Sequence, residues 1–283
     1  MERSLGLSIS QPVENVFSSG LFDCIEYCIG ANFNLADAYE VWEEKTKRIK
    51  ELCKKYNVKM NSYHLPFNGE RHRGVYMHAP ASLDARIREK TLERTKRLIE
   101  GVADAHPKFV ILHGSLRIPP EERRERLDYF IEYVRELCDF CKPYGITVAV
   151  ETLLECCIGG GGDVPENRIA EHRYIMENVG RDNVGICLDN NHFIKSDPIE
   201  FVKELGQYVV TTHFSDYDGV EERHYMPGKG ITDWRELTRL IEERGYKGPW
   251  LFEIRFEKSG FPTDEELREL VDGWHKVAGD DGE

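Results

Sequence analysis

The sequence contains no long uninterrupted apolar stretch. Nowhere do about 18 or more apolar residues follow one another, the length at which a membrane-spanning helix is suspected. The opening segment MERSLGLSIS has no apolar run of signal-peptide length. We therefore expect a cytoplasmic protein without a membrane partner.

Positive charge is also scarce. The 283 residues include 38 Lys and Arg against 51 Asp and Glu, which gives a formal net charge of −13 at pH 7. Sequence-independent binding to a phosphate backbone needs clustered Lys and Arg. Nucleic acid is therefore a poor candidate partner.

Two nucleotide-binding signatures are missing as well. No G-x-G-x-x-G turn follows an early strand-like segment, and no G-x-x-x-x-G-K-[ST] occurs. Their absence counts against a doubly wound open sheet that binds a nucleotide. The eight cysteines show no framework spacing, so we expect reduced, mostly buried thiols. Cys138-x-x-Cys141 lies in a predicted helix without a second pair, which favours a structural role over zinc or redox chemistry.

The chain does contain a regular alternation of apolar, β-branched runs and amphipathic segments. The predicted strands are residues 4–10, 21–28, 58–64, 109–113, 146–151, 184–189, 208–213 and 249–254. The predicted helices are residues 35–56, 82–104 with Ser82 as the cap, 119–143, 168–179, 197–205, 233–244 and 263–277. This pattern predicts an α/β protein with a single (β/α)8 TIM barrel over residues 1–278, followed by an acidic tail at 279–283. Residues 66–80 are predicted as a long loop.

Six of these strands end on an ionisable side chain: His64, His113, Glu151, Asp189, His213 and Glu253. In a parallel barrel all carboxyl ends share one face, so we expect these groups to converge there. Four of them, the carboxylates of Glu151, Asp189 and Glu253 and the imidazole of His213, form an oxygen-rich set that suits Mn, Mg or Co. A cation would also offset the mutual repulsion of the acids. The alternative is a ring of salt-bridge partners for Lys and Arg.

Five motifs carry a resemblance to a known family: AVETL around Glu151, LDNNH with Asp189 and His192, HFSDYDG with His213, HYMPGKGITDW with His224, and FEIR with Glu253. Together they resemble the xylose isomerase-like TIM barrels, which include tagatose and psicose 3-epimerases, hydroxypyruvate isomerase, inosose dehydratase and endonuclease IV. The resemblance extends over essentially the whole chain. It is a weak guide to the substrate.

Similarity to the epimerase and isomerase branch implies a metal-dependent enzyme that acts on a sugar or sugar phosphate. It assigns Glu151, Asp189, His213 and Glu253 to one divalent ion, Mn foremost, with Co, Mg or Zn as alternatives. Glu151 and Glu253 would form the acid/base pair that moves a proton through a metal-stabilised enediolate. The expected substrate-binding residues are His64, His113, Glu155, His192, Arg223 and His224. For Glu155 and Arg223 a solvated loop charge is the alternative.

Three other functions stay open. Endonuclease IV binds three zinc ions, and its ligand set matches in order here, except that Glu222 stands where its pattern has an Asp. An inosose dehydratase-like lyase would release a dehydrated ketone. A binding barrel without catalysis would be favoured if Glu151 or Glu253 pointed away from the metal. The sequence also leaves open whether the chain forms a homo-oligomer.

Several conspicuous residues are expected to have no chemical role. The histidines interpreted as surface residues are His72, His78, His106 and His172, and the tryptophans interpreted as packing residues are Trp42, Trp234 and Trp250. Phe67 is expected to form an apolar wall of the site. Lys229 could meet an anionic group, and its neighbouring glycines shape a turn.

Overall fold

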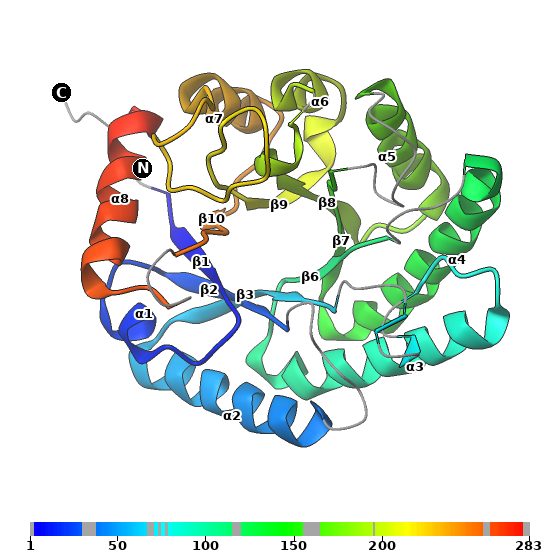
Figure 1. The fold of residues 1–283 in the computed structure, drawn as a ribbon. Coiled ribbons are helices and arrows are strands. Elements are labelled where there is room, and N and C mark those ends of the chain that lie inside the picture. Colours follow the sequence, from blue (N-terminus) through cyan, green and yellow to red (C-terminus); the bar gives the residue numbers. More distant parts are fainter. Residues whose placement is uncertain are drawn as a thin grey trace.

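The computed structural model describes residues 3–29, 38–66, 71–72, 75–76, 79–114, 120–154, 165–194, 196–256 and 261–279. Within them, eight parallel strands form one sheet that curls into a nearly closed barrel, and helices surround it as an outer ring (Figure 1). The chain therefore has the single (β/α)8 barrel that the alternation of strands and helices predicts.

The barrel strands lie close to their predicted positions. They are β1 (Leu5–Ile9), β2 (Cys24–Cys28), β3 (Lys59–His64), β6 (Phe109–Leu112), β7 (Thr147–Glu151), β8 (Val184–Asp189), β9 (Val209–His213) and β10 (Trp250–Phe252). Their order in the sheet is β10-β1-β2-β3-β6-β7-β8-β9. The predicted long loop contains a small antiparallel pair, β4 (Arg71–His72) and β5 (Val75–Tyr76).

The helices follow the strands in the expected alternation. They are α1 (Glu14–Ser18), α2 (Ala38–Tyr56), α3 (Ala85–Val102), α4 (Arg123–Cys141), α5 (Pro165–Val179), α6 (Pro198–Leu205), α7 (Trp234–Glu243) and α8 (Asp264–Ala278). Short 3-10 turns occur at Ala103–Ala105, Pro120–Glu122, Lys142–Tyr144, Asn190–His192 and Gly206–Tyr208. The sequence did not predict α1, because a helix of five residues is too short to show a helical repeat.

The N-cap of helix α3 lies two residues later than predicted. Its N-cap is Asp84, whose side chain accepts a hydrogen bond from the amide of Arg86 at 2.9 Å. The hydroxyl of Ser82 instead accepts from the amide of Asp84 at 3.2 Å, so the assignment of Ser82 as the cap was wrong. Both residue types cap helices, and only the backbone path decides between them.

The barrel closes between β9 and β10 through few contacts. An isolated parallel bridge joins Phe214 to Phe252, just beyond the end of β9. The hydroxyl of Thr212 accepts a hydrogen bond from the amide of Leu251 at 3.1 Å. Through these contacts the last strand completes the cylinder, and the residue after β10 faces the end of β9.

The tryptophans expected to pack in the core do so. Trp42, Trp234 and Trp250 are all buried. Phe214 stacks on Trp250 with ring centroids 5.2 Å apart, and Trp234 meets the same Phe214 ring edge-on at 5.2 Å. These aromatic contacts pack the first residue after β9 against the start of α7 and against β10.

The described cysteines are free thiols, as expected, and most are buried. Cys138 and Cys141 lie inside α4, and burial raises the pKa of each thiol to about 12. Both groups are therefore protonated and unreactive near neutral pH. Cys156 and Cys157 lie outside the described residues. Among the described helices, none is both long and apolar enough to span a bilayer.

Candidate metal centre

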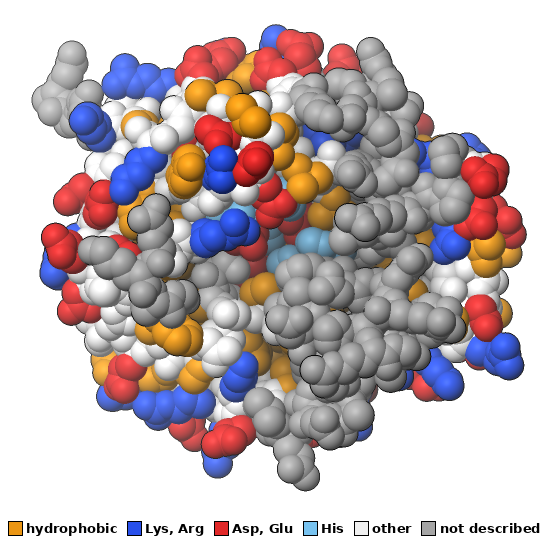
Figure 2. All heavy atoms as spheres, in the orientation of Figure 1, with side chains coloured by type: hydrophobic (Ala, Val, Ile, Leu, Met, Phe, Trp, Pro, Cys, Tyr) orange, Lys and Arg blue, Asp and Glu red, His pale blue; other side chains and the backbone are white. Residues whose placement is uncertain are grey.

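Acidic and histidine side chains gather at the carboxyl ends of the strands. Figure 2 shows them at the floor of a hollow in this face of the barrel. One ligand atom from each of Glu151, Asp189, His213 and Glu253 can be chosen so that all of them lie within 4.8 Å of one another. These are the four side chains that the sequence analysis assigned to one divalent ion. Such a buried group could hold a metal ion.

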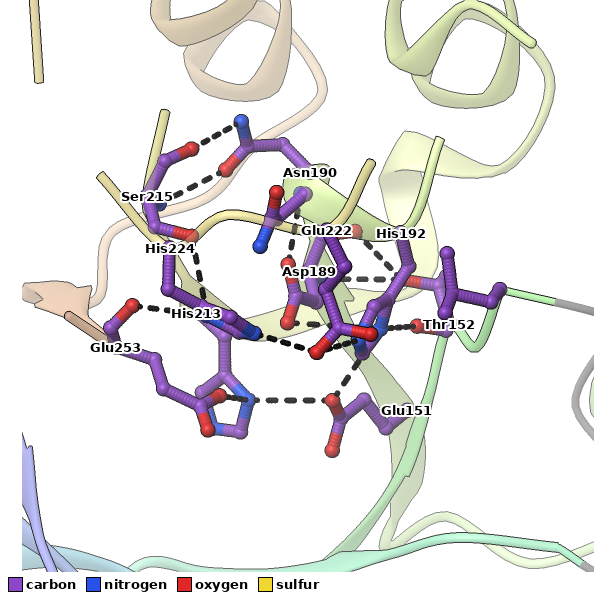
Figure 3. Close-up of polar contacts among 12 residues, drawn as sticks. Glu151, Thr152, Asp189, Asn190, His192, His213, Ser215, Glu222, His224 and Glu253 are labelled. Atoms are coloured by element: carbon purple, nitrogen blue, oxygen red, sulfur yellow. Dashed lines mark hydrogen bonds and ion pairs between the residues drawn. The ribbon is translucent and has the colours of Figure 1, made fainter. Parts of the chain in front are cut away.

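The sheet register places these four groups. Glu151, Asp189 and His213 are the last residues of β7, β8 and β9, and Asp189 pairs directly with His213 in the register of β8 and β9. Glu253 follows β10, and its amide donates to the carbonyl of Phe214 at 3.1 Å across the barrel seam. Figure 3 shows Glu151, His213 and Glu253 pointing toward one another.

Two buried polar atoms in this group have no hydrogen-bond partner among the described residues: Oδ2 of Asp189 and Nδ1 of His213. Nδ1 of His213 lies 3.0 Å from Oε2 of Glu253 and 3.4 Å from Oε1 of Glu151, without hydrogen-bond geometry to either. Buried polar groups are almost always satisfied, so each such atom needs an explanation. A cation among these oxygens and this nitrogen would supply one, and the donor set therefore fits a divalent metal.

The electrostatics of the acids point the same way. Burial by itself would raise the pKa of Glu151, but the neighbouring His113 and His213 hold it well below its usual value. Burial opposes ionisation of Glu253 too, and His213 nevertheless lowers its pKa to about 2. For Asp189 burial prevails and raises the pKa to about 6. The ionised carboxylates of Glu151 and Glu253 thus lie close to Asp189, whose ionisation burial opposes. A positive charge placed among these three acids is strongly favoured.

A pair of histidines contacts the second oxygen of Glu151. Nε2 of His64 lies 3.0 Å and Nε2 of His113 lies 2.7 Å from Oε2 of Glu151. Nδ1 of His64 donates to the carbonyl of Leu65 at 2.8 Å, so that ring bonds oxygen through both nitrogens. Burial works against a charged His64, but Glu151 raises its pKa above the usual value. His64, Glu151 and His213 form a second group whose ligand atoms lie within 4.8 Å.

On the other side of the site, Glu222 lies between two histidines (Figure 3). Its Oε1 is 2.8 Å from Nε2 of His224 and 3.9 Å from Nε2 of His192. Nδ1 of His192 lies 2.6 Å from the carbonyl of Thr152, which fixes the ring. Despite burial, nearby acids, Asp189 first among them, raise the pKa of His192 to about 10. Asp189, His192 and His224 form a third group of closely spaced ligand atoms.

With this geometry in view, comparison with known proteins identifies the family. A family model described as the xylose isomerase-like TIM barrel matches residues 13–276. The chain belongs to this family.

Relatives of this xylose isomerase-like barrel include sugar epimerases. An uncharacterized protein of Methanocaldococcus jannaschii is 26% identical over 251 residues, which are 83% of this chain and 80% of that protein. Fructoselysine 3-epimerase of Shigella flexneri is 26% identical over 211 residues, 71% of this chain and 70% of that enzyme. The solved structure of a D-tagatose 3-epimerase-like protein has a TM-score of 0.74 at 22% identity, and the match covers 97% of this chain and 98% of that one.

Not every residue expected at the site of this xylose isomerase-like barrel lies in the cluster. Arg223 forms ion pairs with Asp218 at 2.7 Å and Glu221 at 2.9 Å, both in its own loop. Lys229 pairs with Glu269 of α8 at 2.6 Å, not with a site anion. Glu155, Phe67 and His78 lie outside the described residues, and the side chain of His72 is not described. The contact of Arg223 and Glu155 with substrate stays a prediction.

One histidine prediction was wrong. His172 was expected at the surface, but it is fully buried beneath the site. Its Nδ1 lies 3.0 Å from the carbonyl of Arg168, and its Nε2 lies 3.4 Å from the carbonyl of Glu151. The helical segment around it has a weak apolar repeat, so the sequence did not show which face turns inward. His106, by contrast, is exposed as expected.

Two buried acids near the cluster were not predicted as site residues. Glu26 lies inside β2 and contacts His213. Asp216 follows β9 and accepts four hydrogen bonds, three from amides of the loop that carries His224 and one from the indole of Trp234 at the start of α7. The available signal was in each case a charged residue inside or next to an apolar run, namely CIEYC and VVTTHFSD. Such a residue is buried only when partners satisfy it, and those partners are distant in sequence.

Proposed function

We propose that this protein is a divalent-metal-dependent sugar isomerase or epimerase that moves a proton beside a carbonyl group. The observation that carries the proposal is the shared position of Glu151, Asp189, His213 and Glu253, whose ligand atoms lie within 4.8 Å of one another. The family and the fructoselysine 3-epimerase relative support the same class of reaction. The substrate would be an open-chain sugar or sugar phosphate.

The four residues have distinct parts in this proposal. Glu151, Asp189, His213 and Glu253 would hold the ion, Mn foremost. A bound divalent cation would polarise the carbonyl and the adjacent hydroxyl oxygen of the sugar and so acidify the C–H bond between them. The low pKa values of Glu151 and Glu253 leave both carboxylates ionised and able to accept a proton.

The two carboxylates come from opposite edges of the site, β7 and the end of β10 (Figure 3). One would remove the proton and the other would return it. Return to the opposite face of the same carbon gives an epimer, and return to the neighbouring carbon gives an isomer. Both carboxylates point into the cluster, which counts against a binding barrel without catalysis.

The test is metal analysis of the purified protein followed by a panel of ketoses in deuterated water. Deuterium at the carbon beside the carbonyl is the expected result. Glu151→Gln and Glu253→Gln should each abolish the exchange while the circular dichroism spectrum is unchanged, and Asp139→Asn, at the exposed end of α4, should exchange normally. Exchange that persists in either glutamine variant would remove that residue from the acid/base pair, and a dehydrated ketone as product would indicate a lyase.

A second function is favoured by the two additional ligand groups, His64 with Glu151 and His213, and Asp189 with His192 and His224. Three such groups at the carboxyl ends of the strands also suit a phosphodiesterase with three zinc ions, similar to endonuclease IV. The net charge of −13 and the presence of Glu222 in place of an Asp count against it. Three zinc ions per chain would favour the nuclease, and one manganese or cobalt ion would favour the sugar enzyme.

A further inference from the structure

We infer that Glu26 is a positioning residue of the metal centre: its carboxylate holds the imidazole of His213 so that Nδ1 faces the ion. This inference rests on the proposed function for the presence of the ion. Among the described residues, Glu26 forms hydrogen bonds with Ser8, Ser62 and His213, and of these only His213 is a proposed ligand.

Glu26 is fully buried in the middle of β2. The strand register places Ser8 of β1 and Ser62 of β3 directly beside it. Ser8 donates its hydroxyl hydrogen to Oε1 of Glu26 at 2.9 Å, and Ser62 donates to Oε2 at 2.8 Å. The three side chains form a row across neighbouring strands, so the carboxylate is fixed from both sides.

The third partner of this carboxylate is a proposed metal ligand. Oε2 of Glu26 lies 3.0 Å from Nε2 of His213, although the two residues are 187 positions apart in the sequence. A carboxylate that already accepts from two hydroxyls has only acceptor capacity left, so Nε2 of His213 must carry the hydrogen. An ion bound at Nδ1 would displace any proton from that nitrogen, and in the resulting neutral ring the lone pair is on Nδ1.

In that tautomer the lone pair on Nδ1 faces the carboxylate oxygens of two other proposed ligands. Nδ1 of His213 lies 3.0 Å from Oε2 of Glu253 and 3.4 Å from Oε1 of Glu151, and it forms no hydrogen bond with the described residues. A histidine that binds a metal through one nitrogen and donates to a carboxylate through the other is held in one tautomer and becomes a stronger ligand. His64 stacks on His213 with centroids 5.5 Å apart and limits rotation of the ring.

A structural role for Glu26 makes a different prediction. If the carboxylate only satisfied Ser8 and Ser62, its loss would lower the stability of the barrel and leave the intrinsic affinity for the ion unchanged. If it positions His213, its loss must weaken metal binding in protein that remains folded. Loss of an outer-shell partner of this kind typically weakens metal affinity about 10- to 100-fold.

The experiment measures Mn²⁺ binding to metal-free protein by isothermal titration calorimetry, with the tautomer of His213 followed by nitrogen-15 NMR. Glu26→Met removes the acceptor at similar volume, and we expect about 10- to 100-fold weaker binding and loss of the Nε2–H tautomer. Glu26→Gln keeps an acceptor oxygen, so its affinity should lie between those of Glu26→Met and the wild type. Ser8→Ala removes only the bond to Oε1 and leaves Ser62 and His213 on Oε2 of Glu26, so it should weaken binding less than Glu26→Met does.

The outcomes separate this inference from the proposed function. Wild-type affinity in folded Glu26→Met overturns the positioning role while the proposed function stands. If that variant fails to fold, Glu26→Gln decides, and a wild-type affinity together with a wild-type tautomer and pH profile of binding overturns the role. A wild-type protein that binds no divalent ion overturns both proposals, and one that binds the ion without proton exchange overturns only the proposed function.

Discussion

The side chain of Thr152 exchanges two hydrogen bonds with the backbone of Asp189. Its Oγ1 donates to the carbonyl of Asp189 at 3.1 Å and accepts from the amide of Asp189 at 2.9 Å. Because Thr152 directly follows Glu151, these bonds tie the end of β7 to the end of β8. Together with the backbone ladder between β7 and β8, this hydroxyl therefore helps to set the spacing of two proposed ligands.

Thr152→Val should lower both stability and metal affinity. The isosteric change leaves two buried backbone groups of Asp189 without this partner, at a cost of about 1–3 kcal/mol for each. Chemical denaturation measures the change in the free energy of unfolding, and titration with Mn²⁺ measures the affinity. Thr152→Ser keeps the hydroxyl and should resemble the wild type in both. A valine variant as stable as the wild type would show that the bonds contribute little.

The stability of the loop after β9 should depend strongly on Asp216. Oδ1 accepts from the amides of Tyr217 and Thr232, and Oδ2 accepts from the amide of Gly228 and the indole of Trp234. Asp216→Asn would turn an NH2 group toward two of these donors and should cost on the order of 3 kcal/mol in the free energy of unfolding.

Asp218→Asn provides the control in the same loop. Its Oδ1 accepts from the amides of Val220 and Glu221, both at 2.8 Å, and the amide oxygen of an asparagine can still accept from both. The substitution also removes the pair of Oδ2 with Arg223 at 2.7 Å, but both of these side chains are about one-third exposed, so we expect a change below about 1 kcal/mol. Equal losses in the two variants would contradict the anchoring role of Asp216.

The buried thiols should resist alkylation at all ordinary pH values. Burial raises the pKa of Cys24, Cys138 and Cys141 to about 12, so each is a neutral thiol below that pH and becomes a reactive thiolate only above it. Iodoacetamide at pH 8 should leave them unmodified in folded protein and label them fully in denaturant, as read by mass spectrometry. Rapid labelling of Cys138 or Cys141 in the native state would point to redox chemistry instead.

Divalent metal should stabilise the fold. An ion that binds only the folded state adds about 2.7 kcal/mol to the free energy of unfolding at a concentration 100 times its Kd. Unfolding with and without Mn²⁺, after removal of metal by a chelator, measures this gain. Asp189→Asn should lose most of it. An unfolding midpoint that does not respond to Mn²⁺, Co²⁺, Mg²⁺ or Zn²⁺ would count against any metal at this site.

Much of the fold could be predicted from the sequence because the barrel strands are almost entirely buried. The bounds of β8, Val184–Asp189, were predicted without error, and the start of α8 was visible in Thr263 and Glu266, which form a capping box. The small pair β4 and β5 was missed because two-residue strands carry no periodic signal. For α1 the same reason holds.

The site was predictable in part for a different reason. Parallel strands share a direction, so the residues that end them, such as Glu151 and Asp189, must lie on one face whatever the details of packing. Glu26 could not be assigned this way because it lies within its strand. Its contact with His213 joins β2 to β9 across the barrel interior, and no local pattern reports a contact over that sequence distance. The inward turn of His172 also depends on tertiary packing alone.

The seam of the barrel lies under the proposed ligands. Glu151, Asp189 and His213 end three strands joined by a continuous ladder, whereas Glu253 belongs to the other side of the junction that Phe214 and Phe252 bridge. An ion held by all four would link β7, β8 and β9 to the end of β10 across this junction. Loading the site would then lock β9 to β10, so metal binding would also complete the closure of the barrel.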